Sequence, residues 1–359
     1  MTARTYLDWN ATAPLRPEAR EAMLEAMDLA GNPSSVHAEG RKAKGMLERA
    51  RAQVAELAGV EPNEVIFTSG ATEAATLACA GRKLACADIE HDAVFAHQSN
   101  SLSTQKNGEV AESLIDGDML AIQAANSETG VLQNNFGHAQ RAWATGAMVL
   151  VDAVQAAAKV RFSLADLGAD FLLLSGHKIG GPKGTGALCL KLGVDVTAGI
   201  PGGGQEQGRR SGTENLIGAV GFGAAAASAL DDQEKGVWDD VATLRDAFEE
   251  RILNDAPDAI IVGQTAPRLP NTSCIAVPGW KGETQVMQMD LAGFAISAGS
   301  ACSSGKVKKS RVLSAMGFDD VTAASAIRVS IGPTTHKNDL MRFADTWVSH
   351  YIKHKARAA

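Results

Sequence analysis

Short apolar segments rich in valine, isoleucine and leucine alternate with helical patterns from about residue 15 to residue 230, and this alternation constrains the fold more than any other feature of the chain. Each apolar segment has the length of a buried strand. Strands joined through helices form a mostly parallel sheet with both faces covered. The pattern therefore predicts an α/β fold with strands at residues 65–69, 120–124, 148–151, 171–174 and 186–190, and helices at residues 42–57, 72–84, 136–145 and 217–230.

The pattern changes near Asp231, where the regular alternation of strands and helices ends. Residues 233–254 are predicted to form one long, charged amphipathic helix. The opening segment, residues 5–8, is expected to pair as a strand with the part of the chain that follows. That part has the separate elements of a smaller α+β domain, with strands at residues 259–262, 273–277 and 327–331 and helices at residues 283–291, 321–326 and 340–354.

Composition excludes several classes of protein. The 359 residues are 45% hydrophobic and 21% charged, which is typical of a globular protein rather than a disordered or fibrous one. A net charge of −7 makes nucleic acid a poor first expectation as a partner. The N-terminus lacks a secretory signal, and the apolar run at residues 217–230 is too short to cross a bilayer. Five cysteines without a Cys-x-x-Cys pair indicate reduced thiols, so we expect a cytoplasmic protein with no metal site.

Three strand ends carry candidate chemistry, because ligands of such sheets bind at the carboxyl ends of the strands. Gly70 opens a helix whose N–H groups, with the Thr72 hydroxyl, suit a phosphate. Asp152 ends a buried strand, and one helical turn would point Gln155 in the same direction. Lys178 follows another buried strand among glycines. Partial desolvation there is expected to lower the pKa of the amine and make it a nucleophile.

Each of these features also has a plainer interpretation. The turn at Gly70 could be an ordinary capped helix, Asp152 could cap the helix that follows it, and Lys178 could be a surface lysine in a mobile turn. Together, however, an amine, a carboxylate and an anion pocket are what pyridoxal 5′-phosphate requires. The lysine would form a Schiff base, the aspartate would keep the pyridine nitrogen protonated, and the helix N-terminus would hold the phosphate.

Seven motifs in order make the chain resemble the cysteine desulfurases, which are fold-type-I pyridoxal-phosphate enzymes of the class-V aminotransferase group. The resemblance implies a large coenzyme-binding α/β domain at residues 12–242, with a mostly parallel seven-stranded sheet between helices. It also implies a smaller α+β domain, formed by residues 1–11 and 243–359, that carries a catalytic-cysteine loop. The motifs are YLDWNATAP at residues 6–14, GNPSSVH at 31–37, FTSGATE at 67–73, VDAVQ at 151–155, SGHK at 175–178, RSGT at 210–213 and GSAC at 299–302.

The resemblance also implies a role for each residue around the coenzyme. Lys178 would form the Schiff base, Asp152 would face the pyridine nitrogen and Gln155 the ring hydroxyl. His91 would stack on the ring and move protons; its alternative is a solvated loop histidine. The phosphate would be bound by Ala71, Thr72, Ser175 and His177.

Further implied roles concern the subunit partner, the substrate and the ring hydroxyl. Thr213 would reach the phosphate of a neighbouring subunit, which implies a homodimer with shared sites; an ordinary turn is the alternative. Arg328 would bind the substrate carboxylate together with Asn32, whereas the plainer interpretation of Arg328 is a structural ion pair. The chain departs from the family at Ser127, where a second asparagine is common. Contact with the ring hydroxyl would then depend more on Gln155, or on Asn126 as a substitute.

Cys302 is the candidate nucleophile. It lies among small residues in the sequence SAGSACSSG, which predicts an exposed loop, whereas the other four cysteines have apolar surroundings that indicate structural roles. An incidental thiol is the alternative. The resemblance implies that L-cysteine is converted to L-alanine while Cys302 takes the sulfur as a persulfide. An acceptor protein would then receive the sulfur for iron–sulfur cluster or other sulfur-containing cofactor biosynthesis. The rival hypotheses are an aminotransferase or selenocysteine lyase of the same fold and a non-catalytic dimeric scaffold.

Overall fold

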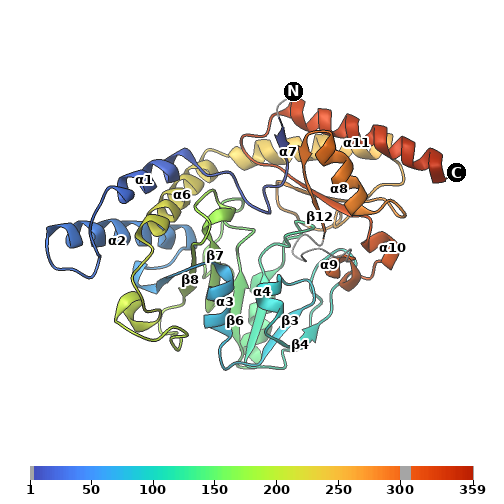
Figure 1. The fold of residues 1–359 in the computed structure, drawn as a ribbon. Coiled ribbons are helices and arrows are strands. Elements are labelled where there is room, and N and C mark those ends of the chain that lie inside the picture. Colours follow the sequence, from blue (N-terminus) through green and yellow to red (C-terminus); the bar gives the residue numbers. More distant parts are fainter. Residues whose placement is uncertain (1–3, 300–308, 359) are drawn as a thin grey trace.

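The structure is a computed structural model that describes residues 4–299 and 309–358 (Figure 1). Within these residues, the largest sheet has seven strands in the order β2-β8-β7-β6-β5-β3-β4. Strand β8 runs antiparallel to both neighbours, and the other neighbouring pairs are parallel. The predicted mostly parallel sheet is therefore confirmed. Its strands are β2 (Val65–Thr68), β3 (Leu84–Ala87), β4 (Gln98–Leu102), β5 (Met119–Gln123), β6 (Met148–Asp152), β7 (Phe171–Ser175) and β8 (Gly186–Leu190).

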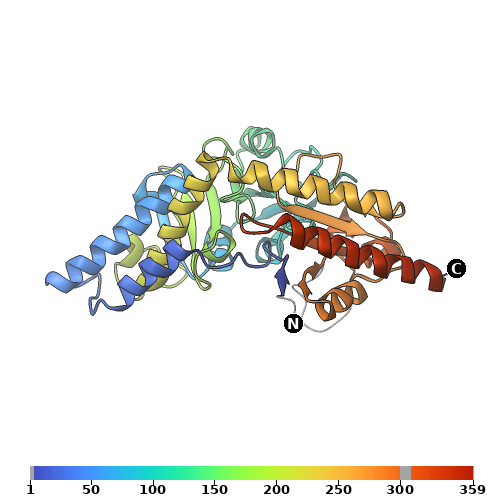
Figure 2. The ribbon, with the colours of Figure 1, turned by 90° about the horizontal axis from the view of Figure 1, so that it is seen from above.

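Helices cover both faces of this sheet (Figures 1 and 2). Side chains alternate between the faces of a strand, so Val65 and Phe67 join one apolar core while Ile66 joins another. The first core includes residues of α2, α5 and α6, and the second includes residues of α3 and α4. Helix α1 packs along α6. The bounds are α1 (Pro17–Met27), α2 (Ala38–Ala58), α3 (Ala71–Cys79), α4 (Asp92–Phe95), α5 (Asn135–Ala144) and α6 (Leu216–Glu234).

A second, antiparallel sheet follows in the order β12-β13-β10-β9. Its core contains Trp347, Phe343 and Phe248, which are fully buried. The opening segment returns here as predicted, because β1 (Thr5–Tyr6) pairs with β11 and Asp8 bridges to Ser330. The other elements are α7 (Val237–Asp255), β9 (Ile260–Ile261), β10 (Thr272–Ala276), α8 (Gly282–Leu291), β11 (Phe294–Ala295), β12 (Ser297–Ala298), α9 (Arg311–Ala315), α10 (Asp320–Ala323), β13 (Ala326–Ser330) and α11 (Lys337–Ala358).

Three predicted helices were wrong in extent, two of them because of a glycine. The helix expected at 321–326 is shorter, since α10 ends at Ala323 and Ala326 begins β13. The helix expected at 72–84 ends at Cys79, since Gly81 turns the chain at φ 73° and Leu84 begins β3. The single helix expected at 233–254 is divided where Gly236 adopts φ 69°, and α6 and α7 flank the break. Strand β4 had no apolar signal because its sequence, QSNSL, is polar. The domain boundary predicted at residue 242 falls within α7 and remains a prediction.

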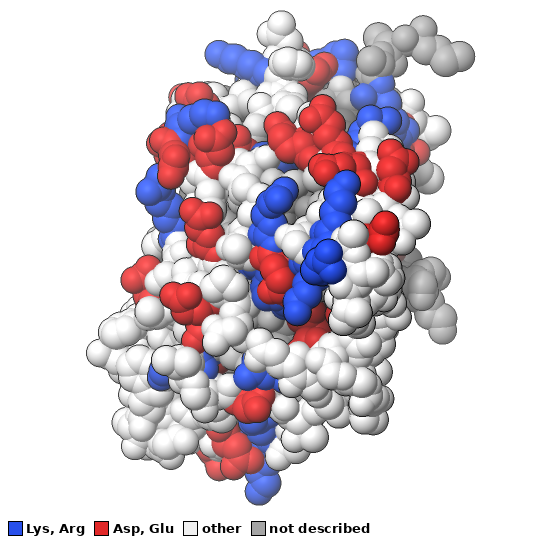
Figure 3. Space-filling model, turned by 90° about the vertical axis from the view of Figure 1, so that its left-hand side faces the viewer, with Lys and Arg blue, Asp and Glu red and all other residues white. Residues whose placement is uncertain are grey.

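The composition predicted neither a strongly basic face nor a membrane-spanning segment, and the structure can be compared with both expectations. On the side that lies at the left of Figure 1, Lys and Arg side chains are interspersed with Asp and Glu side chains, so this face has no single sign of charge (Figure 3). Among the helices of the described residues, none combines the length and the apolar character that a membrane crossing requires.

A buried ion pair anchors the loop that leads to Arg210 and Thr213. The Nη1 and Nη2 atoms of Arg51 lie 2.7 and 2.8 Å from Glu206 Oε2 and Oε1, and the Phe67 N–H donates to the same carboxylate at 2.9 Å. Glu206 itself has φ 46°, a left-handed conformation that strains a residue other than glycine. The ion pair and the Phe67 bond therefore hold a strained backbone in place.

We predict that Arg51→Met lowers the free energy of unfolding by about 3–5 kcal/mol, because the Glu206 carboxylate stays buried without its countercharge. Denaturant titration measures this change. Arg49→Met, on the exposed side of the same helix, is the matched control and should differ from the parent by less than about 0.5 kcal/mol. The double variant Arg51→Met/Glu206→Met should recover part of the loss; equal stability of Arg51→Met and the control would contradict the argument.

Candidate active site

The three predicted strand ends meet at one edge of the large sheet. Asp152, the last residue of β6, pairs in register with Leu173 of β7. Ser175, the last residue of β7, is opposite Gly186, and Gly186 is in turn opposite Thr68 at the end of β2. The carboxylate, the lysine turn and the helix-opening glycine turn therefore lie at the ends of β6, β7 and β2 on one edge of the sheet, with β8 between β7 and β2.

Lys178 ends a short 3₁₀ turn, Gly176–Lys178, that follows β7 directly. Its side chain is partly buried, and Nζ donates to the backbone oxygens of Asn10 at 2.6 Å and Ala11 at 3.0 Å. These bonds hold the amine against the segment that follows β1. They disfavour the alternative of a surface lysine in a mobile turn.

Asp152 is buried, and one of its carboxylate oxygens accepts the Val154 N–H at 3.0 Å. The pKa of this carboxyl is raised, because burial outweighs the nearby charges of His91 and Lys178, which lower it. Those two cations therefore act directly on Asp152. The chain continues from Asp152 as a series of turns and not as a helix, so the alternative that Asp152 caps a helix is wrong.

Gln155 lies in these turns and is also buried. Its Nε2 donates to the Asn10 backbone oxygen at 3.0 Å, which Lys178 shares. The Asn10 side chain contacts the second sheet through Thr272 at 2.8 Å. Asn10 belongs to the first recognised motif, but its role did not emerge from the sequence because its partners are far away along the chain.

The expected phosphate end of the site is built by the turn before α3 and by the end of β7. Ala71 and Thr72 begin α3, and a Cβ on Gly186 would lie only 2.6 Å from Gly70 Cα, so only glycine lets β8 approach this turn. Ser175 is buried beside it. His177 has its Nδ1 3.0 Å from Thr12 Oγ1. Burial, followed by the charge of Lys178, lowers the pKa of His177 to about 4, so the imidazole is neutral at pH 7.

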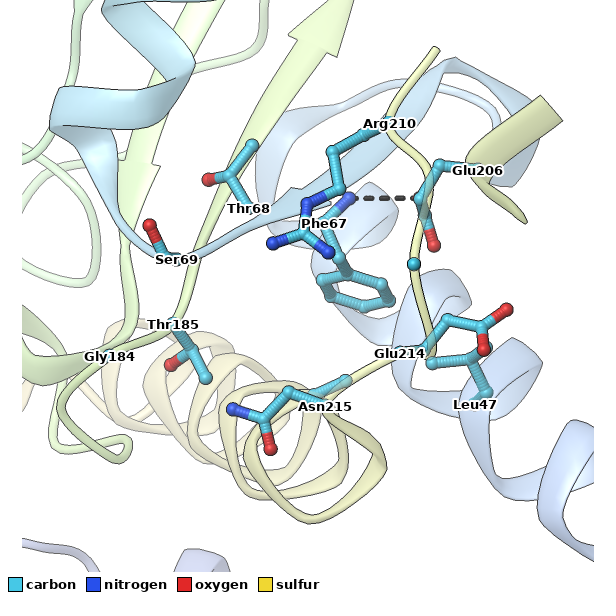
Figure 4. A pocket seen from close by; sticks show the side chains of 12 residues that line it. Leu47, Phe67, Thr68, Ser69, Gly184, Thr185, Glu206, Arg210, Glu214 and Asn215 are labelled. Carbon is cyan, nitrogen blue, oxygen red and sulfur yellow. Dashed lines mark hydrogen bonds between the residues drawn. The ribbon is translucent and has the colours of Figure 1, made fainter. Parts of the chain in front are cut away.

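A cavity of about 230 Å³ lies between the end of β2 and the loop held by Glu206 (Figure 4). Arg210 projects toward Ser69 from this loop. Arg210 Nε is 3.0 Å from Glu73 Oε1, while the other Glu73 oxygen accepts the Ser69 N–H at 2.7 Å. Thr213 is exposed, between the lining residues Gly212 and Glu214. The loop of Arg210 and Thr213 is thus tied to the predicted phosphate turn.

Arg328, on β13, reaches the same edge from the second sheet. Nη2 lies 2.7 Å from Asp8 Oδ1, so the ion pair that the plainer interpretation expected is present. Nη1 donates to the backbone oxygen of Ser127 at 3.1 Å. The third donor, Nε, is buried and has no hydrogen-bond partner within the part of the chain that the structure describes. An orphaned cationic donor is costly and fits an anionic ligand group.

The side chain of Asn126 is occupied by the turn that it organises. Its Oδ1 accepts the N–H groups of Glu128 and Thr129, both at 2.9 Å. Its Nδ2 donates to Ile89 O at 3.1 Å and to Gln123 Oε1 at 3.4 Å. Both amide hydrogens are therefore in use, which favours Gln155 over Asn126 for contact with a ring hydroxyl.

His91 is exposed at the start of α4, where its Nδ1 accepts the Ala93 N–H at 3.2 Å. Its charge acts on Asp152 and on His177, which places it near both. The preceding residue, Glu90, is fully buried, and burial together with the charge of Asp152 raises its pKa to about 8. A pKa of about 8 leaves the Glu90 carboxyl mostly protonated at pH 7.

The structure does not bring Asn32 to this cluster. Asn32 lies in the exposed connection between α1 and α2, where its side chain accepts the Ser34 N–H at 2.8 Å. Cys302, the candidate nucleophile, lies outside the described residues. The cysteines inside them are all buried, as expected for structural thiols, and burial raises the pKa of Cys79 to about 11 and that of Cys189 to about 12.

The groups present at this edge fit pyridoxal 5′-phosphate. A partly buried amine, a buried carboxyl group near His91 and Lys178, and a helix N-terminus with hydroxyl groups match the aldehyde, the pyridine nitrogen and the phosphate, respectively. Within the described ranges, no cluster of three or more His, Cys, Asp or Glu side chains is placed to hold a metal ion.

Comparisons with known proteins identify the family of the chain. The sequence profile of the aminotransferase class-V family matches residues 5–343. A cysteine desulfurase of Cereibacter sphaeroides is 40% identical, with 95% of this chain and 94% of the relative covered. The cysteine desulfurase IscS of Dictyoglomus turgidum is 33% identical, covering 95% and 92%. A solved NifS-like protein from Rickettsia africae has a TM-score of 0.89 at 32% identity, with 97% of this chain and 99% of that chain covered. The chain belongs to the cysteine desulfurase family within the class-V aminotransferases.

Proposed function

We propose that this protein is a cysteine desulfurase that uses pyridoxal 5′-phosphate to convert L-cysteine to L-alanine while Cys302 takes up the sulfur. The observation that carries the proposal is the meeting of Lys178, Asp152 and the α3 N-terminus at one sheet edge. Relatives named cysteine desulfurase and a similar solved protein, SspA, described in complex with cysteine, support the choice of substrate.

The coenzyme, when bound, supplies an electron sink that lets the substrate Cα proton leave and weakens the Cβ–S bond. Lys178 Nζ would hold the coenzyme covalently and then move the Cα proton. Asp152 would keep a proton on the ring nitrogen, with the charges of His91 and Lys178 favouring its ionised form. His91 would stack on the ring and relay protons.

The remaining residues would orient the two ligands. Ala71, Thr72, Ser175 and His177 would bind the phosphate, with Thr213 contributed across a homodimer. Ser127 offers its backbone oxygen to Arg328. The buried Nε of Arg328 would then donate to the substrate carboxylate. Asn32 would contact the substrate only in a dimer in which the connection between α1 and α2 reaches the site of the second subunit.

Sulfur transfer is assigned to Cys302. Its thiolate would attack the substrate sulfur, so that an S–S bond forms while the Cβ–S bond breaks. The bonding electrons stay with Cβ, which takes up a proton, and the product leaves as alanine. The persulfide would be passed in the cytoplasm to an acceptor protein for iron–sulfur cluster or other sulfur-containing cofactor synthesis, in keeping with the name of the IscS relative.

The rival functions differ in what they require. An aminotransferase would not need Cys302, a selenocysteine lyase would prefer the selenium substrate, and a silent scaffold would bind no coenzyme.

We predict that Lys178→Ala loses covalent coenzyme. The protein is incubated with pyridoxal 5′-phosphate, reduced with borohydride and digested, and the peptides are weighed. The parent and the exposed control Lys183→Ala should carry the adduct on Lys178, because only that amine follows β7 at the sheet edge. An adduct retained in Lys178→Ala, or none in the parent, would contradict the assignment.

Asp152→Asn should lower the rate of alanine formation about 100-fold or more, because a neutral amide cannot hold the ring nitrogen protonated and preorganised charge contributes this much to catalysis. Amino-acid analysis of the reaction measures it. The exposed Asp166→Asn variant is the control. Unchanged turnover in Asp152→Asn would show that the carboxylate serves only the turn at Val154.

Cys302→Ala should bind cysteine and coenzyme normally but release almost no alanine, even with a thiol acceptor present. Replacement of the buried Cys79 by alanine controls for the loss of a thiol. Mass spectrometry of the Cys302 peptide should find one additional sulfur in the parent protein after incubation with cysteine. Full alanine production by Cys302→Ala would remove this residue from the reaction.

A further inference from the structure

A second lysine, Lys159, lies buried beside the candidate site, and the function proposed above gives it no role. It is only 5% exposed. Its Nζ donates to three oxygens, which are Gln155 Oε1 at 2.8 Å, Gln155 O at 3.0 Å and Asn10 Oδ1 at 3.2 Å. A buried amine whose hydrogens are all bonded has a specific set of partners, unlike a lysine whose side chain only covers apolar surface.

The backbone before Lys159 is strained in a way that brings the amine to Gln155. Ala158 is buried and has φ 70°, in the left-handed region that an alanine rarely adopts. Such a conformation persists only where the surrounding contacts impose it. Here the chain turns back at Ala158, so that the Lys159 side chain returns to Gln155.

The hydrogen bonds of Gln155 decide which end of its amide can meet a ligand. The protonated Lys159 amine has three hydrogens and no acceptor, so in this form the amide oxygen is the atom of Gln155 that faces it. One hydrogen of Nε2 is used by the Asn10 backbone oxygen. The remaining polar group of the amide is the second N–H, so Gln155 offers a donor and not an acceptor to a ligand.

We propose that Lys159 is a positioning residue, which locks the Gln155 amide with its N–H toward the ring hydroxyl oxygen of pyridoxal 5′-phosphate. The proposal rests on the proposed function, since it concerns the same coenzyme. A donated hydrogen bond stabilises negative charge on that oxygen. Negative charge on that oxygen would otherwise attract the proton on the nitrogen that joins Lys178 to the coenzyme. A donated hydrogen bond would weaken this attraction and so lower the pKa of that nitrogen.

Lys159 is also close to other charged groups. Burial, followed by repulsion from Lys178 and Arg328, lowers the pKa of Lys159 well below its usual value, while its three oxygen partners oppose this by holding the protonated amine. Lys178 also faces Asp152, whose carboxylate is in turn affected by His91. Any effect of Lys159 on the Lys178 nitrogen could therefore come through Gln155 or directly through charge, and the experiment must separate the two routes.

The test is a pH titration of the absorbance of added pyridoxal 5′-phosphate bound to the full-length protein. Lys159→Met should raise the midpoint by about half a unit to one unit, since a hydrogen bond and one pKa unit carry similar free energies. Lys42→Met, on the exposed side of α2, is the matched control and should leave the midpoint unchanged. Lys159→Leu removes the same amine with a different shape and replaces the methionine variant if that one does not fold.

A double-variant cycle separates positioning from direct charge. Gln155→Ala should raise the midpoint by a similar amount, and Lys159→Met added to it should have no further effect. Additive shifts would mean that Lys159 acts through its charge alone and would overturn the proposal, as would an unchanged midpoint in Lys159→Met with coenzyme bound. Absence of a coenzyme band in the parent protein would instead defeat the proposed function.

Discussion

A buried asparagine near the start of the chain, Asn10, joins the two sheets, and the candidate site depends on it. Its backbone oxygen accepts from Lys178 and Gln155 of the large sheet, while its N–H and side chain bond Ser330 and Thr272 of the smaller one. Because unsatisfied buried polar groups are costly, these partners must be brought together whenever the chain folds. The amine and the second sheet are thereby held in one arrangement.

Burial also shifts the pKa values of titratable groups at the edge of the large sheet. Of the two buried acids near His91, burial raises the pKa of Glu90 to about 8, and the cations nearby act on Asp152. His177 is neutral at pH 7 because its pKa is lowered to about 4, whereas Arg328 forms an ion pair with Asp8. Burial therefore favours the neutral forms of Glu90 and His177, and shifted pKa values of this kind are typical of catalytic sites.

Residues adjacent in sequence to a buried strand were predicted well. Asp152 and Ser175 come directly after an apolar run and Lys178 follows three residues later, so the local pattern placed them at strand ends. The predictions failed where the signal was not periodic. Strand β4 is polar, and the helix break at Gly236 depends on the backbone conformation of one residue inside a continuous helical pattern. The role of Lys159 was missed because a lysine in an alanine-rich turn shows nothing of its partners.

The sequence by itself determined the alternation of strands and helices, the residues at the strand ends and the family to which they point, because periodicity and motifs are properties of neighbouring residues. Only the tertiary structure decided which donor meets which acceptor. Asp8 and Arg328 are 320 positions apart, and Asn10 and Lys178 are 168 apart. Such pairs arise from the order in which strands lie side by side, and a local pattern carries no information about distance in space.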